Sequence, residues 1–94
     1  MERNMILRII DRGMDRDTYD ALRIQLDIDH QHPLGLIMHG ATEVDGAIRV
    51  AQVWESEWYA RRFDEEILAP ALHAVGARLE AEVAVYQLEH LVTP

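Results

Sequence analysis

The chain has 94 residues, which is the size of one domain and too short for two. Its 17 acidic residues outnumber its 9 basic ones, all of them arginine, and the formal charge of −8 disfavours binding to nucleic acid or to an anionic membrane surface. There is no cysteine, so disulfide and thiol chemistry are excluded. A domain of this size has a modest core, to which association with a second copy would add.

The chain shows no sign of a targeting or membrane segment. The N-terminal stretch MERNMILRII has too short an apolar run for a signal peptide before it meets Asp11. Nowhere does an apolar run approach the roughly 18 residues of a membrane span. We therefore expect one cytoplasmic domain over residues 1–94, with no membrane or nucleic-acid partner.

The first two elements are expected to be a strand and a helix. Residues 5–10 are rich in β-branched side chains and end at an Asp-Arg-Gly turn, which predicts a strand. In the following stretch, MDRDTYDALRIQL, Asp15 and Asp17 are candidate N-caps, and apolar residues recur on one helical face. This predicts an amphipathic helix whose apolar stripe is Tyr19, Leu22 and Leu26.

Two apolar runs about Asp45-Gly46 predict a β-hairpin over residues 36–54. A type I′ turn needs positive φ at both central positions, which Asp and Gly tolerate. Counting back from a two-residue turn gives the pairs His39 with Gln52, Ala41 with Val50 and Ile37 with Trp54 on one face, and Met38 with Val53 on the other.

A second helix and a last strand complete the chain. Ser56 can cap a helix in which Tyr59, Phe63 and Ile67 form an apolar stripe, and Pro70 should bend or break it. Gly76 is the expected C-cap, and residues 82–88 form the last strand.

The order β-α-β-β-α-β predicts an α+β ferredoxin-like fold: a four-stranded antiparallel sheet with both helices on one face. The first and last strands carry apolar side chains on both sides, whereas a sheet with one solvated face alternates cleanly. We expect a second copy to cover the other face, giving a homodimer packed sheet on sheet. A charge at Val83 or Val85, taken as central sheet positions, should then dissociate or unfold it.

One polar pair stands out within the hairpin. His39 and Gln52 form a polar spot ringed by apolar residues, as in small-molecule sites, and burial would favour the neutral ring that a general base needs. The alternative is a structural histidine satisfied by Gln52 or by water. Other residues that would line such a site are Tyr19, Trp54, Trp58 and Tyr59, which could equally be plain core.

The remaining histidines give weaker signals. His30 and His32 stand beside Asp27 and Asp29, but His-x-His alone fixes no third ligand, so we expect a solvated loop and no metal. His73 falls in the last helical turn, where a cation suits the helix dipole, and is expected to be structural or at the cavity rim.

The run VWESEWYARRF, followed by ILAPAL and a short final strand, resembles the dimeric α/β-barrel superfamily near its antibiotic-biosynthesis-monooxygenase branch. The resemblance covers the whole chain in element order and implies sheets paired across a two-fold axis. It also implies a small, often aromatic, molecule held between helices and sheet. Phe63 stands where many members carry a histidine, which disfavours haem ligation and weakens the monooxygenase assignment.

Two functions of different class remain open. One is a cofactor-independent monooxygenase or cyclase that acts on a hydrophobic aromatic or polyketide-like metabolite, with His39 as acid/base. The other is a non-catalytic dimer that serves as a binding or interaction module. A void of several hundred Å³ touching His39 favours ligand binding, and a filled core favours a structural role.

Overall fold

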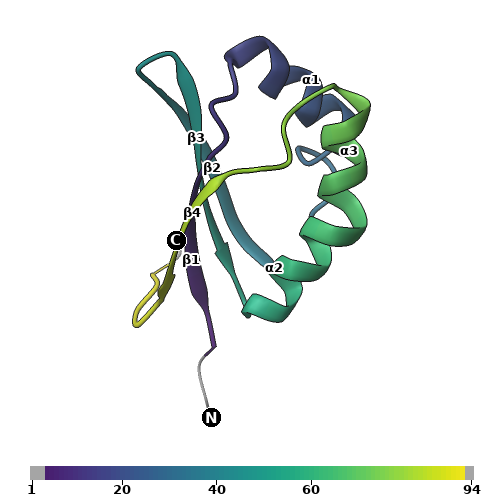
Figure 1. Ribbon diagram of the computed structural model, residues 1–94. Helices are drawn as coiled ribbons and strands as arrows, with labels where there is room; N and C mark the ends of the chain where they lie inside the picture. The colour runs from purple at the N-terminus through teal and green to yellow at the C-terminus, as the bar shows by residue number, and fades with distance from the viewer. Residues whose placement is uncertain (1–3, 93–94) are drawn as a thin grey trace.

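The computed structural model describes residues 4–92, and its elements follow the predicted order (Figure 1). The strands are β1 (Ile6–Asp11), β2 (Leu36–Val44), β3 (Ala47–Trp54) and β4 (Glu82–Gln87). The first helix is α1 (Arg16–Leu26), and the second runs through α2 (Glu57–Phe63), a π-helical turn η1 (Asp64–Leu68) and α3 (Ala69–Ala74).

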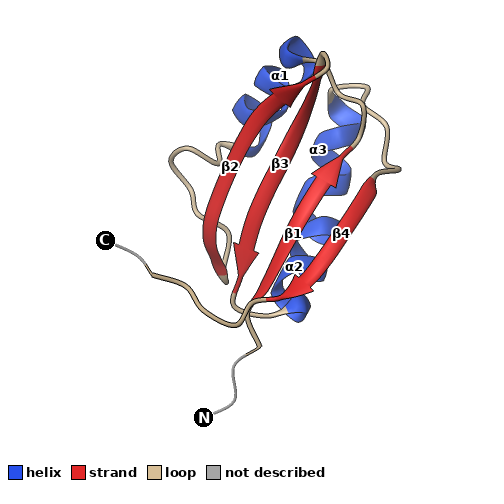
Figure 2. Ribbon diagram, turned by 90° about the vertical axis from the view of Figure 1, so that its left-hand side faces the viewer, coloured by secondary structure: helices blue, strands red, loops and turns tan. Residues whose placement is uncertain are grey.

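The four strands form one antiparallel sheet in the order β2-β3-β1-β4. Both helices cover the same face in Figure 1, and Figure 2 shows the other face with no helix in front of it. This arrangement confirms the ferredoxin-like α+β fold.

The first helix begins where one of the two candidate caps predicted it. Asp15 has extended backbone angles, and its Oδ1 accepts a hydrogen bond from the Thr18 N–H at 2.8 Å. At the other end, Asp27 takes a left-handed conformation, and its N–H bonds to carbonyls of the last turn. The helix buries Leu22 against the sheet.

The hairpin turns at Asp45 and Gly46, which have φ of 52° and 82°, as a type I′ turn requires. The predicted pairs His39 with Gln52, Ala41 with Val50 and Met38 with Val53 are confirmed. The pairing of Ile37 with Trp54 is wrong, because a bulge makes Ile37 an extra residue and brings Leu36 opposite Trp54.

The second helix does not break at Pro70. It widens just before the proline, where the Ala69 N–H bonds to the carbonyl of Asp64, five residues back. The extra residue in this turn shifts the buried stripe by one position. Leu68 is therefore buried, and Ile67, predicted to be in the stripe, is 46% exposed.

The helix ends as the sequence predicts. Gly76 has φ of 71°, its N–H bonds to the His73 carbonyl at 3.1 Å, and the Ala77 N–H bonds to the Leu72 carbonyl at 2.9 Å. These two bonds form a Schellman motif, in which glycine supplies the left-handed residue.

The two faces of the sheet differ in what covers them. The main core lies under the helices and is built around Trp54 and Leu72, with Phe63 and Leu68. The open face carries Leu7 and Ile9 of β1 together with Met38 and Tyr86, which are 49% and 57% exposed.

The last strand lies at the edge of the sheet, not at its centre. Val83 and Val85 pair with Ile10 and Arg8, so they share the helix-facing side, but they are 46% and 48% exposed. The prediction that they are central is wrong, because the strand order leaves β4 with a neighbour on one side alone.

Candidate functional site

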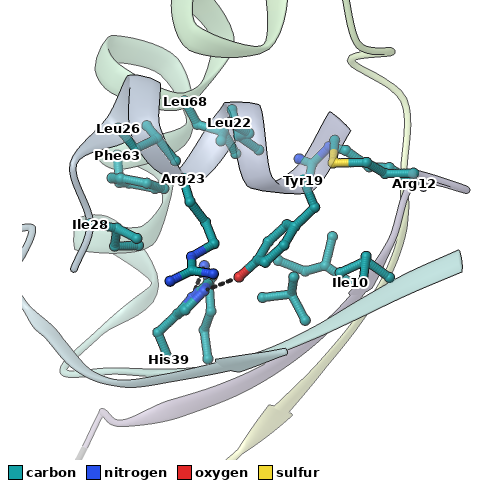
Figure 3. Close-up of a pocket in the computed structure, with 14 residues that line it drawn as sticks. Ile10, Arg12, Tyr19, Leu22, Arg23, Leu26, Ile28, His39, Phe63 and Leu68 are labelled. Carbon is teal, nitrogen blue, oxygen red and sulfur yellow. Dashed lines mark hydrogen bonds between the residues drawn. The ribbon is translucent and has the colours of Figure 1, made fainter. Parts of the chain in front are cut away.

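A small cavity lies between α1, the second helix and the centre of the sheet, and Figure 3 shows the side chains that line it. Its volume is about 40 Å³, which is room for a few water molecules. It touches His39, but it is far smaller than the several hundred Å³ that would hold a whole aromatic ligand, so cavity volume taken alone favours the structural role. Its wall is largely apolar, with contributions from Ile10, Leu22, Ile28, Ile48, Val50, Phe63 and Leu68.

The side-chain amide of Gln52 is fixed in one orientation. Its Oε1 accepts hydrogen bonds from Nη2 of Arg8 at 2.8 Å and from Nε1 of Trp54 at 2.9 Å. Arg8 and Trp54 can only donate hydrogen bonds at these nitrogens. If the amide were inverted, its NH₂ group, also a donor, would face both of them and no hydrogen bond could form. Gln52 is 4% exposed, and no bulk water compensates an inverted amide there. Its NH₂ group therefore faces Nδ1 of His39, 3.4 Å away.

This orientation decides the tautomer of His39. A donor facing Nδ1 requires that nitrogen to be an unprotonated acceptor, so the ring proton is on Nε2. The Nε2–H group then donates to the hydroxyl oxygen of Tyr19 at 3.0 Å, the bond drawn in Figure 3. The Tyr19 proton is consequently free to be donated elsewhere.

Burial shifts the acid–base equilibria of both partners toward neutrality. It lowers the pKa of His39, with the field of Arg23 acting in the same direction and that of Asp29 opposing it. Burial likewise raises the pKa of the Tyr19 hydroxyl. At neutral pH the site holds a neutral imidazole beside a neutral phenol.

A partly buried ion pair anchors the network on its other side. The guanidinium of Arg8, which is 6% exposed, contacts both carboxylate oxygens of Asp64, at 2.6 and 3.1 Å. Asp64 begins the π-helical turn, and turns of this type occur frequently at functional sites. Arg8 also lies 5.7 Å from the centre of the Trp54 ring system. The polar chain thus runs from the second helix across the sheet to α1.

Two further arginines line the cavity. Arg23 of α1 forms an ion pair with Asp29 at the rim. Arg12 follows β1 on the helix-facing side, and its Nε is buried without a hydrogen-bond partner. Burial lowers the pKa of the Arg12 guanidinium.

The structure brings three of the six predicted site residues together. Tyr19, His39 and Gln52 line the cavity and are joined by hydrogen bonds. Trp54, expected as a wall, is fully buried and does not line it, because its ring packs on Phe63 at 5.3 Å and its N–H is held by Gln52.

Tyr59 and Trp58 lie elsewhere, in a groove of about 190 Å³ between the second helix and the loop at residues 33–34, here called the outer groove. The Tyr59 ring packs directly on the backbone of Gly35. Any side chain at position 35 would prevent this, because its Cβ would lie 2.3 Å from the ring. Phe63 lines both spaces and separates the groove from the cavity.

Sequence reasoning missed Arg8, Asp64 and Arg12. The available signal was a charged residue at the centre of the apolar run MILRII, on the same side as Ile6 and Ile10. A charge at such a position needs a partner, although its separation of 56 residues from Asp64 hides which one.

Across residues 4–92, no group of three or more His, Asp or Glu side chains is placed to hold a metal ion. In the predicted His-x-His loop, Nδ1 of His30 bonds to Asp27 at 2.7 Å. The same part of the chain contains no helix with the length and apolarity needed to cross a membrane.

Comparison with known proteins gives a likeness of fold. No family model matches the chain, and no curated protein sequence matches it significantly. Among solved structures, one similar fold is that of a point mutant of SnoaB, a cofactor-independent oxygenase from Streptomyces nogalater. The two structures superpose with a TM-score of 0.68 at 11% sequence identity, and the alignment covers 97% of this chain and 99% of SnoaB.

Two other structures show the same likeness. A Caulobacter crescentus protein proposed to be an antibiotic biosynthesis monooxygenase has a TM-score of 0.68 at 11% identity, with 94% and 92% of the two chains covered. A monooxygenase from Streptomyces coelicolor in complex with nanaomycin D has a TM-score of 0.62 at 10% identity, with 98% and 93% covered. The chain therefore has the ferredoxin-like α+β fold of antibiotic biosynthesis monooxygenase-like proteins.

Proposed function

We propose that this protein is a homodimer that binds a small hydrophobic molecule in the cavity between helices and sheet. The observation that carries the proposal is the free donor of Tyr19 beside a cavity with apolar walls. An apolar pocket with a few oriented polar groups is the usual composition of a small-molecule site. In this proposal the protein works in the cytoplasm, as its sequence predicts.

The size of the cavity defines how a ligand would sit. A volume of about 40 Å³ accommodates a polar head group or a small part of a ring. Tyr19, Arg23 and His39 are half-buried, so this end of the cavity is close to the surface. A larger ligand would extend outward there, or displace Phe63 and reach the outer groove.

The dimer follows from the open face of the sheet. Ile9 and Leu7 lie at its centre on β1, and the exposed Met38 and Tyr86 flank them on β2 and β4. An apolar sheet face of this kind is stabilised by a second apolar layer. Packing two copies face to face supplies that layer with closed two-fold symmetry.

A second candidate is an enzyme, namely a cofactor-independent oxygenase or cyclase acting on an aromatic or polyketide-like metabolite. Support comes from the neutral His39–Tyr19 pair at the cavity and from the fold shared with SnoaB, itself described as a cofactor-independent oxygenase. Both ring nitrogens of His39 face protein groups, so it would act on a substrate through the Tyr19 hydroxyl. In this arrangement His39 is a positioning residue for that hydroxyl.

Native mass spectrometry of the protein purified from its own host tests the proposal. We expect the mass of two 10.8 kDa chains plus a non-covalent ligand that denaturation releases. Val50→Phe should lose the ligand because Val50 lines the cavity, and Val83→Phe on the exposed edge strand is the matched control. A host-purified dimer with no added mass would contradict ligand binding, and a 10.8 kDa species would contradict the dimer.

A further inference from the structure

Arg12 is a half-buried arginine whose guanidinium is not paired with a carboxylate of its own in the part of the chain that the structure describes. It continues the helix-facing side of β1 beyond Ile10, and it is half-buried. Its Nε is buried without a partner, as is the Nε of Arg8, but unlike Arg8 its guanidinium forms no hydrogen bond or ion pair with any other residue between positions 4 and 92. Burying the Nε–H group without a hydrogen-bond partner is unfavourable unless something compensates it.

The charges around the cavity balance except at Arg12. Arg8 occupies both oxygens of Asp64, which is also the carboxylate whose field acts most on Arg12. Arg23 is paired with Asp29 at the rim. The chain as a whole carries a formal charge of −8, so carboxylates are plentiful, yet none is placed on this guanidinium within the described residues. One positive charge is left over.

We infer that Arg12 binds the carboxylate of an acidic ligand, and this rests on the proposed binding function of the cavity. The Nε–H and a neighbouring Nη–H of a guanidinium form a planar fork that matches the two oxygens of a carboxylate. The unpartnered atom of Arg12 is one arm of that fork.

The position of Arg12 also defines the second polar contact of the ligand. In Figure 3, Arg12 lies on the far side of Tyr19 from His39, and the Tyr19 hydroxyl points to His39. The two groups therefore bind different parts of one molecule. The ligand class is an apolar carboxylic acid, in which an acceptor oxygen away from the carboxylate would add a second contact, to Tyr19.

A structural role for Arg12 makes the opposite prediction for stability. If Arg12 served to neutralise Asp64, replacing it would destabilise the fold. If it is held uncompensated for a ligand, Arg12→Met should leave the urea midpoint of the free protein unchanged or raise it, since a desolvated charge is removed.

Binding is tested with carboxylates and their neutral amide counterparts, in the pairs benzoate and benzamide, 2-naphthoate and 2-naphthamide, and octanoate and octanamide. Each is titrated into ¹⁵N-labelled protein and followed through the amide resonances of the cavity residues. For at least one pair, we expect the carboxylate to bind ten-fold or more tightly than the amide. Arg12→Met should remove this preference, Arg12→Lys should retain part of it, and Arg61→Met, on an exposed helix face, should leave it intact.

The outcomes separate the two proposals. Equal affinities for acid and amide in the unmodified protein, or an unchanged preference in Arg12→Met, would overturn the role of Arg12 and leave ligand binding standing. A lowered urea midpoint in Arg12→Met would also overturn it. Failure of every compound to perturb the cavity resonances would overturn the role of Arg12, while ligand binding itself stands or falls with the native mass spectrum.

Discussion

Each face of the sheet contains residues that depart from the usual relation between polarity and exposure. On the helix-facing side, Arg8 and Gln52 are 6% and 4% exposed, and each is tied into a chain of hydrogen bonds. On the open side, Met38 and Tyr86 are apolar or aromatic and about half exposed. Two polar groups thus lie within the apolar core, where water is excluded, and two large apolar or aromatic side chains of the open face lie uncovered.

This contrast indicates what each face is for. Burying an arginine and a glutamine costs free energy that an apolar core would avoid, so their retention points to an arranged site. Leaving an apolar face uncovered is equally unfavourable for an isolated chain and points to a partner. Substitutions that alter one face at a time should therefore have separate effects on association and on the site.

The largest effect is expected on the open face. Ile9→Asp should dissociate the proposed dimer, because the new carboxylate would be buried without a partner, at a cost of about 3 kcal/mol or more. Light scattering with circular dichroism would measure mass and folding together. Ile24→Asp makes the same change at a site on α1 that is 81% exposed, and it should have no effect. A dimer of unchanged stability in Ile9→Asp would show that the partner uses another surface.

The next effect concerns the ion pair on the helix-facing side. Asp64→Ala leaves the buried Arg8 without its carboxylate and should lower the free energy of unfolding by about 2 kcal/mol, less than for a fully buried pair because Asp64 is a third exposed. Glu57→Ala breaks the exposed pair with Arg61 and should cost at most about 0.5 kcal/mol. Urea denaturation measures both. Equal losses would mean that the Arg8 network adds no stability.

A smaller effect is expected at the cavity. His39→Ala should cost about 1 kcal/mol, at the low end of the range for an unmade hydrogen bond, because the contact from Gln52 is long at 3.4 Å. Tyr19→Phe should cost no more than this, since it removes the hydroxyl alone. Both variants should lose affinity for a ligand while remaining folded. Full ligand affinity in His39→Ala would contradict a role for the histidine in the site.

The smallest effect is a dependence on pH. Because burial lowers the pKa of His39 below its value in the unfolded chain, the unfolded state binds more protons between those two values. Stability is therefore fully present above about pH 6.5 and falls as the pH is lowered toward the folded-state pKa, by at most about 1.4 kcal/mol per unit. Urea midpoints between pH 5 and 7.5 should show a shallower slope in His39→Gln. Parallel profiles would refute the shift.

The sequence predicted the elements, the sheet and most of the hairpin register, because hydrophobic periodicity and the Asp45-Gly46 turn are local signals. It failed where one extra residue enters an element. The bulge at Ile37 and the π-helical turn before Pro70 each shift the pattern by one position, which moved Ile37 and Ile67 from their expected places.

The site was predictable in part for a related reason. His39 and Gln52 meet through the register of one hairpin, so counting residues was enough to pair them. Arg8 and Asp64 meet across the core, where no local pattern records the contact. Arg12 forms no hydrogen bond or ion pair with another charged residue in the described part of the chain, so no pattern of paired charges points to it. Its proposed role depends on the burial of its Nε, which cannot be read from the sequence.

The central claim is that Gln52 holds His39 as a neutral imidazole whose proton is on Nε2, so that the Tyr19 hydroxyl is available to a ligand. Long-range ¹H–¹⁵N correlation spectra of the histidine side chains at pH 7.5 test this directly. We predict an unprotonated Nδ1 and a protonated Nε2 for His39. A proton on Nδ1, or a charged ring, would contradict the orientation of the network and the donor role of Tyr19.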